Sequence, residues 1–349
     1  MPPAIDVASF LSSAQADGIL GLLHDRVSAT GAAARLPPAL VEGLRAGAHR
    51  QVALELAQRA ELRRVVAAVR SMGLEVLLMK GASLAYDVYP DPAWRVRSDV
   101  DMLIHAADRA AVRAGLDDLG YVCEPEVSGR LVAYQFHSQR IDEHGVRHLC
   151  DVHWKVANPQ RFADAVRFDE LAEAAVPLPL LGPDARGLGR MHALWLASVH
   201  RAAHHYDQDN LVWLYDVHLL MGALDAAGVA RFVALAERTG VRRICLRALL
   251  LARARFGTEI PSSALAALEA APEDEPSTMF LGPGVRKLDV LLDDVRVLSG
   301  WRPRLTLVKE HLFPDEAYMR RTYASGSSAP TLWLYARRIV TGAAKWLRR

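Results

Sequence analysis

The chain has 349 residues and 51% of them are apolar, so it can bury a substantial core, and disorder as its main state is excluded. Its 42 lysines and arginines nearly balance its 40 aspartates and glutamates, which leaves a formal charge of only +2. This balance argues against a long nucleic acid as partner, because sequence-independent binding to phosphate backbones needs a basic surface.

The cellular compartment is expected to be the cytoplasm. No apolar run approaches the roughly 20 residues that cross a bilayer, and the first residues lack the basic region and apolar stretch of a secretory signal. The three cysteines, Cys123, Cys150 and Cys245, form no CxxC pair, so neither a disulfide framework nor a thiolate zinc site is expected.

Residues 1–72 are predicted to form an N-terminal helical segment, because apolar residues recur at intervals of three and four over residues 54–69. The pattern changes at Gly73, after which residues 74–79 form a short apolar run typical of a strand buried on both faces. A short helix is expected over residues 82–89, where prolines follow.

Four more strands are expected in the next stretch, over residues 98–104, 121–124, 131–137 and 146–156. A helix over residues 106–119, ended by Gly120, separates the first two of them. Together these elements predict an α+β fold whose small mixed sheet lies within residues 73–157.

Beyond about Met191 the strand pattern fades, and residues 158–325 are predicted to form an all-helical substrate or cap domain. Residues 326–349 are expected to be a hinge (GSSAP) followed by a basic amphipathic helix. Such a helix can lie on an anionic membrane, but the favoured interpretation is a terminal helix that packs on the body with its cations in solvent.

Asp99 and Asp101 lie two residues apart on an expected strand, so their side chains leave the same face of the sheet. Like charges this close resist joint ionisation, so the pair is expected to share a proton or to hold a divalent metal. Asp151 lies on a later strand and completes a carboxylate cluster if the two strands are neighbours. For an isolated Asp-x-Asp pair, two solvated acids at a strand end remain the alternative.

A phosphate site is expected next to these acids. The strand over residues 74–79 ends at Lys80-Gly81 and leads directly into a helix, which presents amide groups and a positive helix end to an anion. Arg95 and Arg97 precede the acidic pair, where guanidinium groups can hold phosphate oxygens. A lysine at the end of a buried strand can instead extend to solvent.

The order of these motifs resembles the nucleotidyltransferase superfamily related to DNA polymerase β. The strings KGASLAYDVYPDPAWRVRSDVDMLI and CDVHW are most similar to an uncharacterised bacterial nucleotidyltransferase family, which has a Lys-Gly first motif and an R-x-x-x-D-x-D second motif. Some members of that family occur near peptide-modification genes. The resemblance therefore extends to a role in peptide or natural-product modification.

The resemblance implies metal-dependent transfer of a nucleoside monophosphate from a nucleoside triphosphate, preferably ATP, to an acceptor, with release of pyrophosphate. It implies that Asp99, Asp101 and Asp151 are catalytic and hold two Mg²⁺ ions, for which Mn²⁺ can substitute. The donor phosphates would be held by Lys80, Gly81, Ala82, Ser83, Arg95 and Arg97. Because Ala82 stands where the superfamily has Ser or Gly, Ser83 or Lys80 would supply the missing contact.

Polar and aromatic residues of the helical half are expected to line the groove where the base or acceptor lies: His200, His204, Asn210, Trp213 and Asp216. His153 shares the face of Asp151 and is expected to orient it or to touch substrate. His200 and His204, four residues apart, also have the spacing of a zinc-binding pair, without an assured third ligand.

The acceptor remains open among a peptide, a protein and a small molecule, because grooves diverge freely on a shared catalytic core. Two alternatives stay beside the favoured function. One is a catalytically inactive protein, antitoxin-like or a scaffold, that binds nucleotide or peptide. The other is a transferase of the aminoglycoside-modifying type, with the same chemistry and a small polyhydroxylated acceptor.

Overall fold

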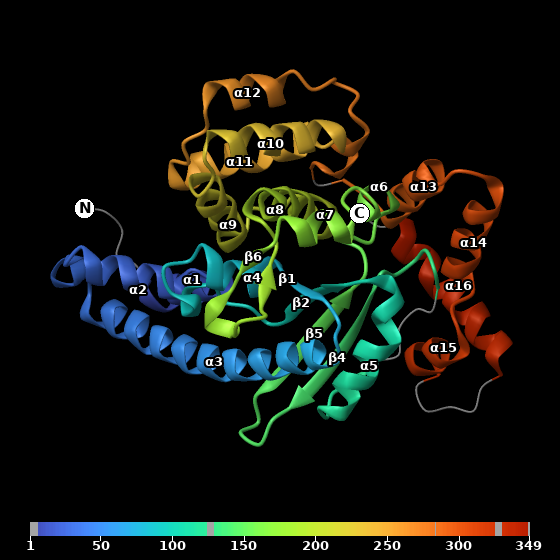
Figure 1. The fold of residues 1–349 in the computed structure, drawn as a ribbon, viewed down its shortest axis with the longest axis horizontal. Coiled ribbons are helices and arrows are strands. Elements are labelled where there is room, and N and C mark those ends of the chain that lie inside the picture. The colour runs from blue at the N-terminus through green and yellow to red at the C-terminus, as the bar shows by residue number, and fades with distance from the viewer. Residues whose placement is uncertain (1–5, 124–128, 283, 325–329, 348–349) are drawn as a thin grey trace.

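The computed structural model describes residues 6–123, 129–282, 284–324 and 330–347. It consists of a mixed sheet covered by helices and followed by a helical region (Figure 1), so the expected α+β architecture is confirmed. The seven strands of the described residues form one sheet in the order β3-β4-β5-β2-β1-β7-β6. They are β1 (Val76–Met79), β2 (Val100–Ile104), β3 (Val122–Cys123), β4 (Gln135–Ile141), β5 (Arg147–His153), β6 (Val176–Pro177) and β7 (Arg186–Gly187).

The two faces of the sheet pack against different sets of helices, as the period-two alternation of side chains requires. Leu78 of β1 and Met102 of β2 point toward α3 (Pro38–Ser71) and α5 (Arg109–Asp118). Leu77 and Leu103 point the other way and share a core with the helical half. Both sides of the central strands are therefore buried, which explains their nearly continuous apolar sequence.

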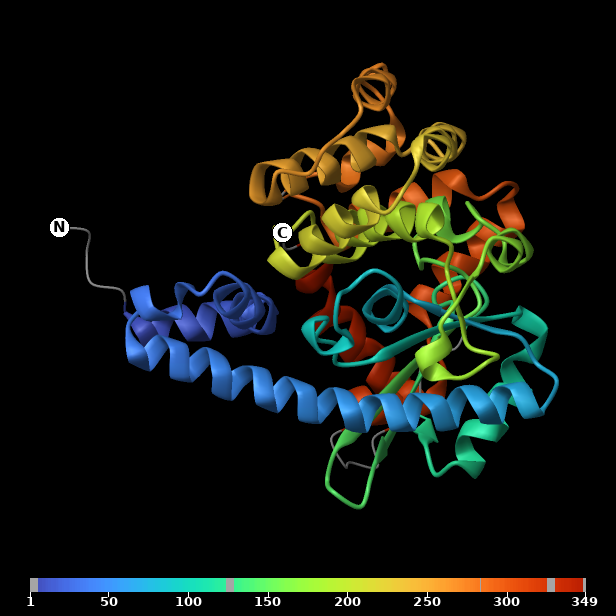
Figure 2. The same cartoon turned by 60° about the vertical axis from the view of Figure 1, so that its left-hand side comes forward.

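The N-terminal segment forms α1 (Val7–Ala16), α2 (Leu20–Ala29) and the long helix α3. Figures 1 and 2 show α3 running along the sheet, with α1 and α2 packed on its first part. Of the apolar residues expected to form one helix face, Leu62, Val65, Val66 and Val69 enter the core under the sheet, whereas Leu54 is exposed.

The helical half begins with α6 (Gln160–Ala163) and α7 (Phe168–Glu173) and continues from α8 (Arg190–His205). The remaining helices are α9 (Leu211–Gly222), α10 (Ala226–Arg238), α11 (Arg242–Phe256), α12 (Ser262–Glu269), α13 (Lys287–Val297), α14 (Trp301–Leu312), α15 (Glu316–Tyr323) and α16 (Thr331–Leu347). None of the described helices combines the length and apolar character needed to span a membrane. The hinge expected at residues 326–330 lies, apart from Pro330, outside the described residues.

Two strand predictions need correction. The region after residue 157 was expected to be entirely helical, yet β6 and β7 lie there and extend the sheet beyond β1. Strands of two residues show no alternation, so the pattern cannot reveal them. The strand expected at 131–137 is β4, which begins four residues later and runs through the polar sequence QFHSQRI.

The helix expected at residues 82–89 is α4 (Lys80–Asp87), which begins directly at the end of β1. Its first residue, Lys80, has a φ of 49°, a left-handed conformation that is strained for a side chain larger than glycine. The tight turn is packed against β7, since Ser83 lies over Gly187: a Cβ at Gly187 would come within 2.1 Å of the Ser83 Oγ.

The packing of Ser83 on Gly187 gives a stability prediction. Gly187→Ala should lower the free energy of unfolding by about 1–3 kcal/mol, because the added methyl group displaces Ser83 or Leu178. Gly222→Ala is the matched control, since a methyl group there meets nothing within 4 Å and should leave stability unchanged or slightly raised. Urea unfolding of the three proteins measures the difference, and equal midpoints for both variants would contradict this packing.

Candidate active site

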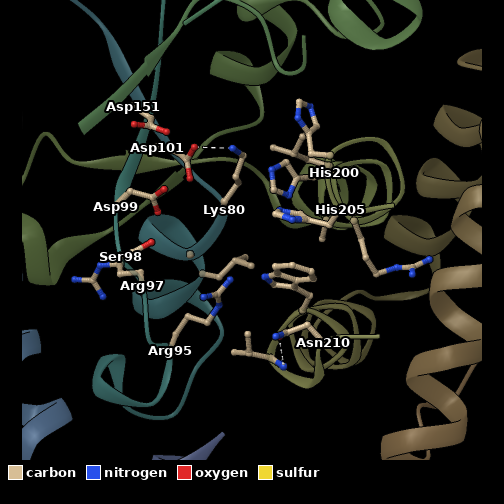
Figure 3. A pocket seen from close by; sticks show the side chains of 18 of the residues that line it. Lys80, Arg95, Arg97, Ser98, Asp99, Asp101, Asp151, His200, His205 and Asn210 are labelled. Atoms are coloured by element: carbon tan, nitrogen blue, oxygen red, sulfur yellow. Dashed lines mark hydrogen bonds and ion pairs between the residues drawn. The ribbon is translucent and has the colours of Figure 1, made fainter. Parts of the chain in front are cut away.

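The acidic residues meet on one face of the sheet. Asp101 on β2 lies directly opposite Asp151 on the parallel neighbour β5, and Asp99 precedes β2 by one residue. All three line a cavity of about 560 Å³ between the sheet and α8. Figure 3 shows the three carboxylates on one side of this cavity, facing His200 and His205 on the other. The strands that carry Asp101 and Asp151 are therefore neighbours, as predicted.

Asp101 carries the strongest interactions. Its Oδ1 accepts hydrogen bonds from the Lys80 ammonium at 2.6 Å and pairs with the His153 Nε2 at 3.0 Å. Burial alone would raise the pKa of Asp101, but Lys80 and His153 outweigh it and hold the pKa below its usual range. The strained backbone of Lys80 thus places the ammonium group against the carboxylate that most needs a counter-charge.

Asp99 is in the opposite electrostatic situation. Burial and the neighbouring carboxylates of Asp101 and Asp151 raise the pKa of Asp99 to about 6. The three carboxylates therefore resist joint ionisation, and a cation placed among them would favour their charged forms.

Within the described part of the chain, one group of side chains could hold a metal ion, namely Asp101, Asp151 and His153, whose ligand atoms all lie within 4.8 Å of one another. Two carboxylates and an imidazole fit a divalent cation, and the imidazole makes Mn²⁺ as suitable as Mg²⁺. The group departs from the predicted ligands in one member: His153 stands where Asp99 was expected, and Asp99 borders the group.

His137 is a site residue that sequence reasoning missed. It lies opposite Asp151 on the antiparallel strand β4, and its Nδ1 is 2.5 Å from the Asp151 Oδ1. The Nε2 of the same ring lies 3.0 Å from the Gln135 Nε2 nitrogen. The alternation of Gln135 and His137 along β4 could have revealed them, but only once the register with β5 was known.

Arg95 lines the cavity, and an ion pair with Asp216 fixes its guanidinium. Its guanidinium donates two hydrogen bonds of 2.8 Å to Asp216 of α9, and the Tyr89 hydroxyl donates to the same carboxylate at 2.7 Å. Burial opposes the charge of Arg95, but Asp216 outweighs this effect and raises the pKa of the guanidinium. Asp216 was expected to line the groove; instead it lies behind Arg95 and outside the cavity lining.

Arg97 is held in a similar way by α3. Its guanidinium lies 2.7 Å from the Glu55 carboxylate and donates to the Tyr86 hydroxyl at 2.8 Å. Its side chain is only 3% exposed, although the residue borders the cavity. Both arginines are held in buried ion pairs, but Arg95 lies next to Gly81, where a Cβ would come within 3.0 Å of its Nη1, so Arg95 is nearer to the expected phosphate side.

The glycine turn reaches the cavity only in part. Gly81 lines it, and a Cβ there would lie 3.0 Å from the Arg95 Nη1, so a side chain would compete with Arg95 for space. Ala82 and Ser83, expected to contact phosphate, are buried and do not line the cavity. Ser83 faces β7 because α4 turns its third and fourth residues toward the sheet.

The opposite wall of the cavity is aromatic. His200, His204, Asn210 and Trp213 line it as predicted, and His205 adds a ring 4.0 Å from that of Trp213. Burial and the Lys80 charge lower the pKa of His204 to about 3 and hold that of His200 well below its usual range. These imidazoles are therefore neutral, and among the described residues they form no three-ligand metal group.

The N-terminal segment also contributes to the cavity, through Gln15 and Gly18 at the turn between α1 and α2. The backbone carbonyl of Asp17 accepts a hydrogen bond of 3.2 Å from the Val212 amide, which fastens this turn to α9. The sequence predicted only a helical segment here. The structure shows that this segment also forms part of the cavity wall.

The mixed sheet, the glycine turn and the facing carboxylates together indicate a nucleotidyltransferase. A family model described as an uncharacterised nucleotidyltransferase matches residues 3–257, more than half of the chain. The chain therefore belongs to this uncharacterised nucleotidyltransferase family. A comparison with curated proteins finds no match. The matched range includes every cavity residue named above and ends before α12.

The Arg95–Asp216 pair gives a second stability prediction. Both side chains are at most 8% exposed, so Asp216→Ala leaves a buried guanidinium without its counter-charge. We expect the free energy of unfolding to fall by about 3–5 kcal/mol, whereas the double variant Arg95→Met/Asp216→Leu loses considerably less. Urea unfolding measures both. A loss below about 1 kcal/mol for Asp216→Ala would contradict a buried, uniquely paired guanidinium.

Proposed function

We propose that this protein transfers a nucleoside monophosphate from a nucleoside triphosphate, preferably ATP, to an acceptor hydroxyl, with release of pyrophosphate and with dependence on Mg²⁺ or Mn²⁺. The observation that carries the proposal is the position of Asp101 directly opposite Asp151 on neighbouring strands, in a cavity beside the Lys80-Gly81 turn. Membership in a nucleotidyltransferase family supports the reaction class.

Asp101, Asp151 and His153 would hold the metal, with Asp99 adding negative charge beside them. A divalent cation bound there supplies charge neutralisation for the triphosphate and lowers the pKa of the acceptor hydroxyl. The acceptor oxygen forms a bond to the α-phosphorus, the bond to the β-phosphate oxygen breaks, and the hydroxyl proton passes to a carboxylate. Asp151 is suited to receive it, because His137 orients this carboxylate from the neighbouring strand.

Lys80 connects the acidic group with the phosphate side of the cavity. Its ammonium now pairs with Asp101, and it becomes available to the donor phosphates once Asp101 has another cation as partner. Gly81 offers space for close approach of a phosphate, and Arg95 stands beside it in a fixed orientation. These groups stabilise the negative charge that develops on the departing pyrophosphate.

The nucleobase is assigned to the aromatic wall. Neutral imidazoles and an indole ring offer flat apolar surfaces for stacking, and Trp213 with His205 forms such a surface at the cavity. Asn210 lines the cavity next to them and can offer both a donor and an acceptor to a base edge.

The role of the carboxylates is tested by substitution. Asp101→Asn and Asp151→Asn should each lower the transfer rate by at least about a hundredfold with the fold intact, because each removes a metal ligand. Asp142→Asn is the matched control: this aspartate lies in the β4–β5 turn, outside the cavity lining, and should keep the wild-type rate. More than a tenth of the wild-type rate in either ligand variant would contradict the assignment.

The role of Lys80 is tested by its effect on the donor. Lys80→Met should raise the KM for the nucleoside triphosphate about tenfold and change kcat less, if the ammonium mainly holds phosphates of the bound donor. Steady-state kinetics at saturating metal separates the two constants. An unchanged KM would leave Lys80 with the structural role of neutralising Asp101.

A non-catalytic nucleotide-binding protein is the second candidate, because the cations of the cavity already have partners: Lys80 pairs with Asp101, Arg95 with Asp216 and Arg97 with Glu55. Titration calorimetry with ATP separates the two functions, since an ATP affinity that does not change with Mg²⁺ favours the non-catalytic protein.

Incubation with labelled ATP, CTP, GTP and UTP plus cell extract, followed by mass spectrometry, identifies donor and acceptor together.

A further inference from the structure

A second cavity of about 530 Å³ lies next to the candidate active site. The end of α8 forms one side of it, and helices α13–α16 form the rest; Figure 1 shows these four helices grouped beside the sheet. His204 lines both cavities, so the two cavities adjoin at this residue. None of the residues assigned above to the metal or the donor phosphates lines this second cavity.

Most of the second cavity is built by residues beyond the end of the family match. The family match ends at residue 257, whereas Lys287, Tyr318 and Arg338 all come from later helices. The catalytic residues, in contrast, lie within the match. A cavity that adjoins the catalytic residues and is built mostly beyond the matched region is a place where a particular acceptor can be recognised.

Arg338 gives the cavity its chemical character. Its guanidinium stacks over the rings of Tyr318 and Tyr323, at 5.6 and 5.8 Å from their centroids. It also donates to the backbone carbonyl of His311 at 2.9 Å. Stacking and this hydrogen bond fix the plane of the guanidinium, which prepares it to bind a carboxylate or phosphate in a defined orientation.

The charges of the lining favour an anion. Lys287 adds a second cation, and among the described residues it forms no ion pair. Among the described residues that line the cavity, the acidic one is Asp294. Its Oδ1 already accepts a hydrogen bond of 2.7 Å from the backbone N–H of Gln160. Burial also raises the pKa of Asp294 to about 7, so its negative charge is incomplete at neutral pH.

We propose that the second cavity binds the acceptor, and that this acceptor is a small molecule with a hydroxyl group and a carboxylate or phosphate. The anionic group lies between Lys287 and Arg338, and the hydroxyl extends past His204 toward the carboxylates of the first cavity. The volume suits a small molecule, not a folded protein. The assignment of the ligand as acceptor rests on the proposed function, whereas the anion site itself does not.

Binding is tested without the reaction. The wild-type chain is equilibrated with the small-molecule fraction of a cell extract and ultrafiltered, and the retained compounds are identified by mass spectrometry. We expect hydroxylated acids or phosphates, retained at least tenfold less by Lys287→Met/Arg338→Met and equally well by Asp101→Asn. Equal retention by the double variant, or retention of neutral compounds or peptides alone, would overturn the proposal.

Structural side effects are controlled in the same experiment. Arg337→Met removes the neighbouring arginine of α16, which lies outside the cavity lining, and should leave retention unchanged. Lys287→Met alone tests an exposed side chain whose loss does not disturb packing, and retention should fall several-fold. Phosphatase treatment or esterification of the extract shows whether the bound anion is a phosphate or a carboxylate.

The retained compound is then offered to the protein with labelled nucleoside triphosphate. Nucleotide transfer to this compound, with a KM raised at least tenfold by Lys287→Met/Arg338→Met and an unchanged KM for the donor, supports its assignment as acceptor. If transfer occurs only to compounds that the cavity does not retain, the assignment is wrong while the proposed function stands. If a compound is retained but no transfer occurs to any acceptor, the proposed function fails and the anion site stands.

Discussion

The buried negative charge of Asp101 is the constraint around which the site is organised. Two carboxylates on neighbouring parallel strands repel each other at close range in a medium of low dielectric constant. Lys80 and His153 offset this repulsion at Asp101, and His137 does so at Asp151. The compensation at Asp101 comes largely from the Lys80 ammonium, so a cation bound at the acidic residues would have to compete with Lys80 for this carboxylate.

The helices outside the sheet act on the site by fixing two arginines. Asp216 of α9 holds Arg95, and Glu55 of α3 holds Arg97, so the loop between β1 and β2 is fastened from both sides. A loop that carries unpaired cations next to three acids would collapse onto them. The buried pairs prevent this collapse, keep the cavity open and orient Arg95 toward Gly81.

The sequence predicts features that depend on local periodicity. The placement of Asp99 and Asp101 on one face and of Met102 on the other follows from alternation along a strand, and the amphipathic face of α3 follows from helical spacing. Features that depend on register or on distant packing escaped prediction. A strand of two residues such as β7 is too short to show alternation. The contact of His137 with Asp151 can be predicted only when the β4–β5 register is known. The packing that turns Ser83 away from the cavity depends on Gly187, which lies far away in the sequence.

The location of the two cavities bears on how acceptor choice can change without loss of chemistry. The residues proposed to hold the metal and the donor phosphates all lie within the family match. The second cavity is set by α13–α16, which contact the sheet-bearing part through few elements, chiefly α13 on α6. Changes in those helices can therefore alter the cations and tyrosines of the second cavity while Asp101 and Asp151 keep their register. Under the proposed function, this division lets the choice of acceptor vary while the residues that carry the chemistry stay in place.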